Sequence, residues 1–278
     1  MTTTASQEAF LKAFHAERPA LTSDVLGRAR ASDGRTSYQV LRDRAAGSRR
    51  VLDLGCGDGL LLELLAGTSG RELAGIDLSP EALALARRRP ALAGARLAVG
   101  RAQELPFADG AFDACVSHLA LMLMGDLELV TAEIARVLAP GGLLACVLGG
   151  GMVGGEVHER FGERLSAALA ALPADRRIPA LGDRRARSRD GLAGLLGPAG
   201  FGPVGWETVL IDLGGPAERV WEAVSGVYDV GPLDEEARAA LHEAFLTEAR
   251  AASGPADGHL PYGFRIHLAA VRPVPPRT

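Results

Sequence analysis

The sequence predicts an α/β protein built on a parallel β-sheet with helices on both faces. Short apolar runs alternate with amphipathic segments between residues 50 and 148. This alternation is typical of a parallel sheet that is covered on both sides. The 278 residues suit one large domain, and 47% hydrophobic against 23% charged residues exclude wholesale disorder.

The first half of the chain supplies five predicted strands and the helices between them. Two helical patterns come first, at 6–17 and 37–47. Strands are expected where apolar runs end in glycine or a polar residue, at 50–54, 73–77, 97–99, 114–117 and 143–148. Helices are expected at 60–65, at 80–89 after the capping residue Ser79, and at 128–138 before a Pro-Gly-Gly stop signal.

The second half is less regular and predicts a lid. We expect helices at 155–172, 189–199, 216–228 and 234–252, and strands at 204–213 and 263–272. The helices at 155–172 and 216–252 are longer than simple crossovers need, so we expect them to cover the carboxyl edge of the sheet. Residues 1–278 then form a single domain, with N-terminal helices at 1–48, a ligand-binding core at 49–150, and the lid and C-terminal strands at 151–278.

Charge and composition restrict the partners and the compartment. The net charge of −4 and the pI of about 5.9 provide no overall attraction to nucleic acid or anionic lipid. No signal peptide is recognisable, and the longest apolar stretch, 141–155, is shorter than the roughly 20 residues of a membrane-spanning helix. Three widely spaced cysteines predict neither a disulfide framework nor a zinc site. We expect a cytoplasmic protein with no membrane attachment, no nucleic-acid partner and no metal.

The strongest motif is the turn DLGCGDG at 53–59, between a predicted strand and a predicted helix. Glycines allow a sharp turn and a close approach of the backbone to a ligand. A dinucleotide fingerprint needs a further glycine where Leu60 stands, so the spacing argues against a dinucleotide. The carboxylate of Asp53 suits a ligand that carries an ammonium group.

Two further segments extend the predicted ligand site along the carboxyl edge of the sheet. Asp77 ends the second strand, where a carboxylate can accept both ribose hydroxyls of a nucleoside. The alternative role for Asp77 is that of a solvated helix-capping residue. Polar residues follow the third strand at 100–107, where they would flank the base of the nucleoside.

With these motifs, the chain resembles the class I S-adenosylmethionine-dependent methyltransferases. The resemblance rests on VLDLGCGDG at 51–59, GIDLS at 75–79, GRAQELPFADGAFD at 100–113 and EIARVLAPGG at 133–142. It covers about residues 35–150. It implies a Rossmann-like sheet of seven strands, the last antiparallel, with S-adenosylmethionine as cofactor and S-adenosylhomocysteine as product.

The resemblance also implies the roles of individual residues. The glycine turn, with Asp53, Gly55, Cys56, Gly57 and Gly59, would hold the methionine part of the cofactor. Asp77 would hold the ribose and Leu78 would pack on the adenine, with Ala102 and Gln103 at its edge and Ser117 near the methionine end. The family often has Asp where this chain has Arg101, which cannot accept a hydrogen bond from the adenine amino group. Gln103 can supply the acceptor instead.

His118, just past the fourth strand, is the candidate general base. A neutral imidazole can deprotonate a hydroxyl or an ammonium group near pH 7. The alternative is a histidine that bonds a backbone carbonyl or only shapes the pocket. His158, His259 and His267 are weaker candidates, and Tyr228 and Tyr262 are candidates for the lid lining.

Several kinds of chemistry are excluded at this edge of the sheet. Residues 117–122 contain no acidic residue, which excludes the metal site of catechol-type methyltransferases. They also lack the Pro-Pro-aromatic motif of DNA methyltransferases that act on amino groups. Cys56 and Cys115 are interpreted as structural rather than nucleophilic. The apolar segment 119–124 predicts either core packing or the wall of an apolar pocket.

The loop at 173–189 is rich in arginine and has two interpretations. It is either a solvated loop or a site for RNA, a carrier-protein phosphopantetheine or an acidic substrate. Lys12 is the only lysine among 30 basic Lys and Arg residues, which indicates a coding bias and weakens any argument from arginine number.

The sequence therefore predicts methylation of a small-molecule acceptor, on oxygen first and nitrogen second, of the kind found in secondary metabolism. A non-methylating cyclisation or rearrangement with the same cofactor is the first alternative. A transferase for tRNA or for a carrier-protein-bound substrate, and a binding protein without catalysis, are the others. The oligomeric state, monomer or dimer, stays open.

Overall fold

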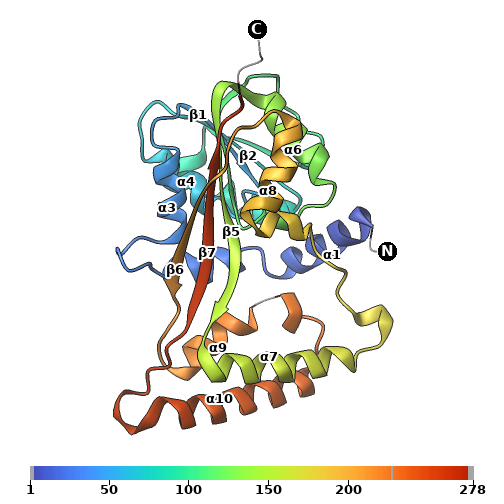
Figure 1. Cartoon of the computed structure of the whole chain (residues 1–278), viewed down its shortest axis with the longest axis vertical. Helices are drawn as coiled ribbons and strands as arrows, with labels where there is room; N and C mark the ends of the chain where they lie inside the picture. Colours follow the sequence, from blue (N-terminus) through green and yellow to red (C-terminus); the bar gives the residue numbers. More distant parts are fainter. Residues whose placement is uncertain (1–2, 227, 275–278) are drawn as a thin grey trace.

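The computed structural model describes residues 3–226 and 228–274 and contains a seven-stranded sheet (Figure 1). The strands are β1 (Arg50–Leu54), β2 (Glu72–Asp77), β3 (Arg96–Val99), β4 (Phe112–His118), β5 (Leu138–Val153), β6 (Gly205–Asp212) and β7 (Gly263–Val271). Their order is β3-β2-β1-β4-β5-β7-β6. Only β7 runs antiparallel to its neighbours, β5 and β6. The predicted α/β fold with an antiparallel last strand is confirmed.

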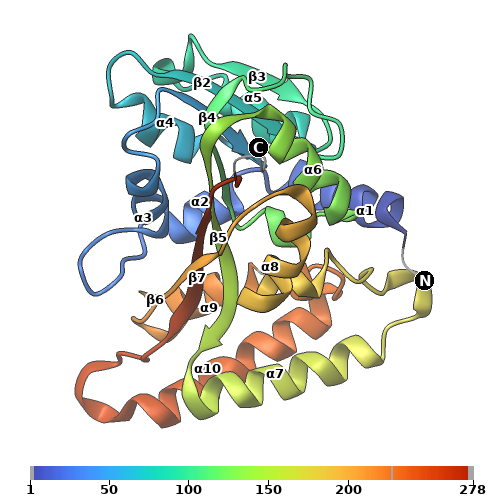
Figure 2. The same cartoon turned by 45° about the horizontal axis from the view of Figure 1, so that its top comes forward.

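Helices cover both faces of the sheet, as the alternating pattern predicts. On one face lie α3 (Ser37–Arg44), α4 (Leu60–Ala66) and α5 (Pro80–Ala86). On the other lie α6 (Leu127–Val137) and α8 (Arg189–Leu196), whose apolar side chains pack on β1, β4 and β5 (Figure 2). The strands between them are buried on both sides, which is why β1 and β4 read as continuous apolar runs.

Three further helices form a layer beyond the carboxyl end of β5, at the bottom of Figure 1. These are α7 (Gly155–Ala170), α9 (Ala217–Ser225) and α10 (Glu235–Asp257). They share an aromatic core in which Phe161 meets Trp221 and Phe245 edge-on, with ring centroids 6.1 and 5.9 Å apart. This layer is the predicted helical lid.

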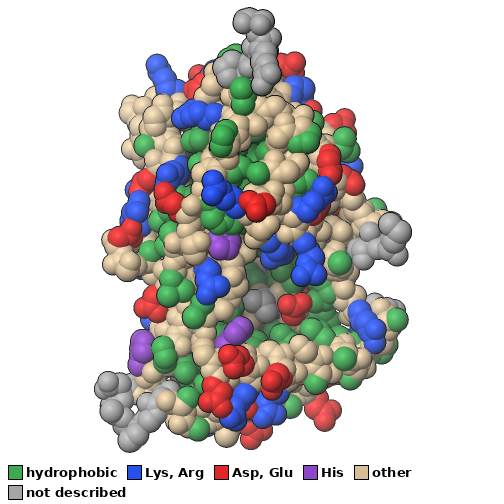
Figure 3. Space-filling view, viewed as in Figure 1, with side chains coloured by type: hydrophobic (Ala, Val, Ile, Leu, Met, Phe, Trp, Pro, Cys, Tyr) green, Lys and Arg blue, Asp and Glu red, His purple; other side chains and the backbone are tan. Residues whose placement is uncertain are grey.

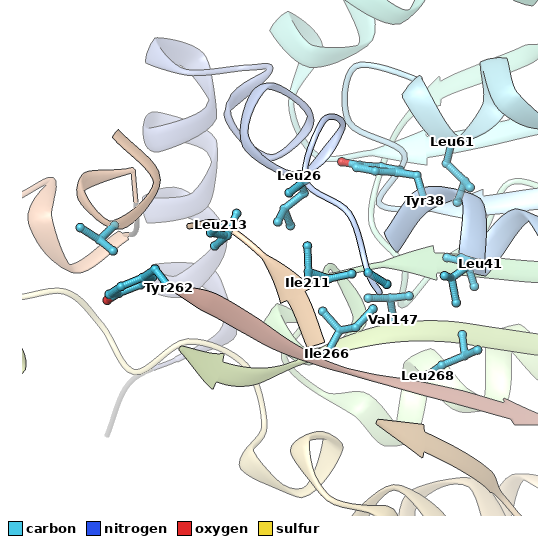
Figure 4. Close-up of a cluster of buried hydrophobic side chains, with 14 of the residues drawn as sticks. Leu26, Tyr38, Leu41, Leu61, Val147, Ile211, Leu213, Tyr262, Ile266 and Leu268 are labelled. Carbon is cyan, nitrogen blue, oxygen red and sulfur yellow. The ribbon is translucent and has the colours of Figure 1, made fainter. Parts of the chain in front are cut away.

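The core continues from the sheet into the N-terminal helices. Figure 4 shows Leu26 and Leu41 beside side chains of β5, β6 and β7, among them Val147, Ile211 and Ile266, with Tyr38 on the side of Leu61. The helices are α1 (Thr4–Glu17), α2 (Leu21–Leu26) and α3. The sequence prediction missed α2, because six residues are too few to display a helical period.

Strand β5 is longer at both ends than its predicted bounds of 143–148. It begins at Leu138, in spite of Pro140, and the pairing with β4 has an irregularity between Phe112 and Ala114. Its pairing with β7 has a second irregularity between Gly149 and Met152. Each irregularity lets the strand continue past glycines that would otherwise end it, so the glycine signals mark bulges rather than strand ends.

Arg71 connects three segments near the amino end of the sheet. Its guanidinium donates hydrogen bonds to the carbonyl oxygens of Ser48 at 3.0 Å, Leu65 at 3.2 Å, Ala45 at 3.0 Å and Ala46 at 2.7 Å. These carbonyls belong to the ends of α3 and α4 and to the loop before β1. A single cation thus satisfies orphan carbonyls at two helix ends.

Replacing Arg71 with alanine should destabilise the fold by about 2–4 kcal/mol, because these carbonyls lose a charged donor. Urea unfolding followed by far-UV circular dichroism measures the change. Arg88→Ala is the matched control, since Arg88 is exposed and its side chain makes no hydrogen bond or ion pair with the described residues. Equal midpoints for the two variants would contradict the role given to Arg71.

Candidate active site

The turn between β1 and α4 depends on three glycines with left-handed backbone. The φ angles of Gly55, Gly57 and Gly59 are 74°, 53° and 81°. A Cβ on Gly55 would lie 2.3 Å from Cβ of Ala120, and a Cβ on Gly59 would lie 2.9 Å from Cβ of Ala86. Backbone conformation favours glycine at all three positions, and close contacts also require it at Gly55 and Gly59. Gly55 and Gly57 line cavities, whereas Gly59 packs against α5.

Asp77 is held in place by the turn that it faces. One carboxylate oxygen accepts the backbone N–H of Gly57 at 2.8 Å, and the other accepts the N–H of Ser79 at 2.9 Å. Ser79 then caps α5 by accepting the N–H of Ala82 at 3.1 Å. Each oxygen of a carboxylate has a second lone pair, so both remain able to accept a hydroxyl of a ligand.

A first cavity of about 100 Å³ lies at the carboxyl ends of β1, β2 and β3. Asp77, Leu78, Ala102 and Gln103 line it, together with Gly55. The amide nitrogen of Gln103 donates to the carbonyl of Gly125 at 2.8 Å, which orients the side chain and leaves its oxygen to accept from a ligand. The geometry therefore brings these five predicted cofactor residues to one cavity.

Helix α1 forms the remaining wall of this first cavity. Gln7, Glu8, Leu11 and His15 of α1 line it. Arg101 donates two hydrogen bonds to the carboxylate of Glu8, at 2.8 and 3.0 Å. Arg101 stands where the family often has Asp. Its side chain does not line the cavity but binds Glu8 and so holds α1 over it.

A second cavity of about 100 Å³ adjoins the first and is lined by three carboxylates. These are Asp53, Asp58 and Asp77. Asp58 pairs with Arg89, but both side-chain oxygens of Asp53 are buried and lack a hydrogen-bond partner in the described structure. Burial, and then the charges of Asp77 and Asp58, hold the pKa of Asp53 well above its usual value. This cavity suits a cationic ligand.

His118 also lines the second cavity, as the position past β4 predicts. Its Nε2 is 2.9 Å from Oγ of Ser37, and its ring stacks on Tyr38 with a centroid distance of 3.7 Å. Its Nδ1 is buried without a partner in the described structure. Burial lowers the pKa of His118 to about 3, so the imidazole is neutral and weakly basic.

Ser117 lies elsewhere than expected, because its side chain points to the other face of the sheet. It is fully buried, donates to the carbonyl of Leu54 at 2.8 Å and accepts the N–H of Leu121 at 3.2 Å. Neither Ser117 nor Gly59 is among the residues that line the two cavities. Both support the site from behind: Ser117 connects β1 to the segment after β4, and Gly59 lets α5 approach. Cys56 lines the second cavity and is otherwise buried.

The sequence analysis missed most residues that the N-terminal helices bring to the site. His15, Ser23 and Tyr38 line the second cavity beside Tyr228 of the lid. His15 and the hydroxyl of Tyr228 are 3.1 Å apart, and Phe14 packs on Tyr228 with a centroid distance of 4.5 Å. The only sequence signal was the aromatic face of the 6–17 helix, which by itself does not name its contact.

A third cavity, of about 660 Å³, lies between the sheet and the lid. Figure 3 shows a hollow on this side of the molecule, with hydrophobic side chains inside it and acidic and basic side chains at its rim. Leu119, Met122 and Leu123 line it, so the apolar segment 119–124 forms a pocket wall. Thr22, Leu119, Leu123 and Tyr228 line both the second and the third cavity, and the two spaces meet there.

The arginine-rich loop at 173–189 is largely occupied by bonds within the protein. Arg177 donates to the carbonyls of Leu172 and Ala170 at the end of α7, and Arg185 pairs with Asp183 and Glu128. Arg176 donates to the carbonyl of Pro232. These contacts favour a structural loop over an RNA site.

Two absences hold for the part of the chain that the structure describes. No helix there is long and apolar enough to cross a membrane. No group of three or more His, Cys, Asp and Glu side chains there is arranged to hold a metal ion.

Comparison with known proteins identifies the family of the core. Residues 52–146 match the family description "Methyltransferase domain". A demethylmenaquinone methyltransferase of Thermus thermophilus is 42% identical over 99 residues, which are 34% of this chain and 45% of that protein. A fatty-acid O-methyltransferase of Mycolicibacterium smegmatis is 37% identical over 113 residues, which are 39% and 41% of the two proteins. The matched segments thus span less than half of either relative.

The fold comparison extends over the whole chain. The crystal structure of the [4+2]-cyclase SpnF matches 97% of both chains with a TM-score of 0.58 at 21% sequence identity, which is a likeness of fold alone. The matched segment contains the glycine turn, Asp77 and His118. Residues 52–146, rather than the whole chain, thus match the methyltransferase domain family.

Proposed function

We propose that this protein transfers a methyl group from S-adenosylmethionine to a small-molecule acceptor. One observation carries the proposal: Asp53 is buried with two unpartnered carboxylate oxygens in a cavity that adjoins the Asp77 cavity. A buried carboxylate without a partner is costly, and the ammonium of a methionine moiety would satisfy it. The other two carboxylates of the second cavity suit the positive charge of a sulfonium.

The two smaller cavities fit the two ends of this cofactor. Asp77 would accept the ribose hydroxyls, Leu78 would pack on the adenine, and Gln103 and the Ala102 backbone would bind its edge. The carboxylate of Asp53 and the turn at Gly55, Cys56 and Gly57 would hold the methionine end. When bound, the cofactor supplies an activated methyl group, so the protein contributes alignment and exclusion of water.

His118 would act at the meeting point of the second and third cavities. Its neutral imidazole with an unpartnered Nδ1 can hydrogen-bond the acceptor atom and hold it in line. With a pKa of about 3 it takes a proton only from an acidic group, so its main contribution is orientation rather than general base catalysis. An acceptor whose oxygen ionises easily fits this arrangement best, which favours O-methylation, with N-methylation second.

A second candidate function is a cyclisation or rearrangement with the cofactor bound but not consumed. The specific observation in its favour is the pairing of a large apolar cavity with a weakly basic His118. The fold likeness to SpnF over nearly the whole chain is compatible with it but concerns the fold only. The two functions differ in one product, because only methyl transfer forms S-adenosylhomocysteine.

The proposal extends to the setting of the reaction. The described cysteines, Cys56, Cys115 and Cys146, are free and buried, which fits a reducing compartment such as the cytoplasm. Pathways that build secondary metabolites use small acceptors of the kind that fits the third cavity.

Calorimetry should show S-adenosylmethionine binding with micromolar affinity, and Asp77→Asn should weaken it at least tenfold. A charge-assisted contact to ribose hydroxyls contributes about 1.5–3 kcal/mol, which is roughly one to two factors of ten. Asp77→Ala should lose more, because the backbone N–H of Gly57 then loses its acceptor as well.

Glu104→Gln is the matched control for this experiment. Glu104 is an exposed acid near the site that lines neither of the smaller cavities. An unchanged affinity of Asp77→Asn for S-adenosylmethionine would contradict the assignment of Asp77 to the ribose. If the parent protein bound neither S-adenosylmethionine nor S-adenosylhomocysteine, the proposed function would be wrong.

Asp53 should make cofactor affinity depend on pH. Because its pKa is raised in the free protein, the carboxyl must lose a proton to pair with an ammonium group. Affinity for S-adenosylmethionine should therefore rise from pH 5 to pH 7, by up to about tenfold per pH unit. Asp53→Asn should bind weakly with a flat pH profile, and a parallel slope in that variant would contradict the assignment.

The same residue should reduce the stability of the ligand-free protein. A carboxyl with a raised folded-state pKa contributes stability below its unfolded pKa, and this contribution is lost as pH rises through the folded value. Asp53→Asn should therefore raise the Tm of the free protein at pH 8 and change it less at pH 5. Differential scanning fluorimetry without and with S-adenosylmethionine measures both effects.

His118 should remain neutral throughout the range in which the protein is folded. Its carbon-13 imidazole resonances should not shift between pH 8 and pH 5, since burial places the pKa near 3. Assignment by comparison with His118→Gln identifies the signals. A titration with a midpoint near 6.5 would show that the ring is hydrated and would restore the general-base role.

A further inference from the structure

The third cavity has a mostly apolar lining. Helix α2 contributes Leu21, Val25 and Leu26, and the segment after β4 contributes Leu119, Met122 and Leu123. The rest of its apolar wall comes from Met152, Ile178, Pro179, Ala180, Leu181, Leu213, Ala223 and Phe264. Clefts of this size and character bury most of the surface of a hydrophobic ligand.

The cavity has only two charged side chains among its lining residues, and they have opposite signs. Arg187 lies just before α8 and Asp229 lies just after α9, and both are exposed. Partial desolvation raises the pKa of the exposed Asp229 carboxyl, and the positive charge of Arg187 opposes this by a smaller amount. The described lining therefore carries one side chain of each sign and no excess charge that would select an anionic or a cationic ligand.

The cavity narrows towards the second cavity at Thr22, Leu119, Leu123 and Tyr228. Leu119 has a φ of 55°, a left-handed conformation that a branched residue keeps only where its surroundings enforce it. The hydroxyl of Tyr228 is fixed by His15 at 3.1 Å. The passage is thus apolar on the Leu119 side and has two hydroxyls, of Thr22 and Tyr228, on the other.

The volume limits the size of the occupant. At about 20 Å³ for each close-packed carbon atom, 660 Å³ corresponds to roughly 20–30 non-hydrogen atoms when the fit is incomplete. That is larger than a single aromatic ring or an amino acid and smaller than a polymer.

We propose that the third cavity binds a neutral, largely apolar acceptor of this size, which enters between α9 and the 178–181 loop and presents its reacting atom past Leu119 and Tyr228. This assignment rests on the proposed function and names its substrate class. A charged group on the buried part of such a molecule would be desolvated without a partner. A phosphopantetheine chain, with its phosphate, is the less suitable occupant.

Two fluorescent probes that differ by one sulfonate test the charge preference directly. N-phenyl-1-naphthylamine is neutral, and 8-anilino-1-naphthalenesulfonate adds one negative charge to the same rings. Titrated into the full chain with S-adenosylmethionine present, the neutral probe should bind at least tenfold more tightly, with one probe per chain. Equal or tighter binding of the sulfonate would overturn the neutral class and favour an anionic acceptor paired with Arg187.

A substitution that fills the third cavity tests whether the neutral probe binds there. Ala223 on α9 lines the cavity, so Ala223→Trp should reduce binding of the neutral probe at least tenfold. Glu222→Trp is the matched control, because Glu222 is the exposed neighbour on the same helix. Loss of probe binding in both variants, or in neither, would overturn the assignment to this cavity.

Cofactor affinity, measured by calorimetry in the same variants, separates this inference from the proposed function. Ala223→Trp should leave binding of S-adenosylmethionine within twofold of the parent value, since Ala223 lines neither of the smaller cavities. Cofactor binding without probe binding would reject the acceptor class and leave the proposed function intact. Probe binding without cofactor binding would reject the proposed function.

Discussion

The hydrogen bond from the backbone N–H of Gly57 to the carboxylate of Asp77 is the interaction on which the site depends. It joins the end of β2 to the turn after β1, and through Ser79 it also fixes the start of α5. The turn tolerates this arrangement because Gly55, Gly57 and Gly59 adopt left-handed backbone that other residues avoid. One carboxylate therefore sets the shape of the glycine turn and the position of the next helix, while it still offers acceptors to a ligand.

Three cavities with different chemical linings lie close to this hydrogen bond. Polar acceptors line the first cavity, carboxylates line the second, and hydrocarbon side chains line the third. Each environment follows from position on the sheet, since residues at the carboxyl ends of parallel strands converge on one edge. Among the described residues of this edge, Asp53 and His118 have buried side-chain atoms without a hydrogen-bond partner, an arrangement that native folds seldom contain.

The N-terminal helices and the lid turn this edge into an enclosed site. Arg101 and Glu8 fasten α1 over the first cavity, and Tyr228 contacts His15 and Phe14 of α1 from the lid side. Segments more than 200 residues apart in the chain therefore meet where the second and third cavities join. These contacts enclose the buried side chains at the carboxyl edge of the sheet.

The local sequence determined the sheet, most helices and the residues of the glycine turn, because these depend on short-range patterns. Apolar runs, glycine positions and caps act over a few residues, and so they placed Asp53, Asp77 and His118 at the carboxyl edge of the sheet. Tertiary structure decided which side chains face the cavities. Ser117 faces the opposite side of β4 from His118, and Arg101 pairs with Glu8 rather than facing the cavity interior. The weak basicity of His118, the unpartnered Asp53 and the walls supplied by α1, α2 and Tyr228 all arise from contacts between distant segments, and burial by such contacts has no signature in a local pattern.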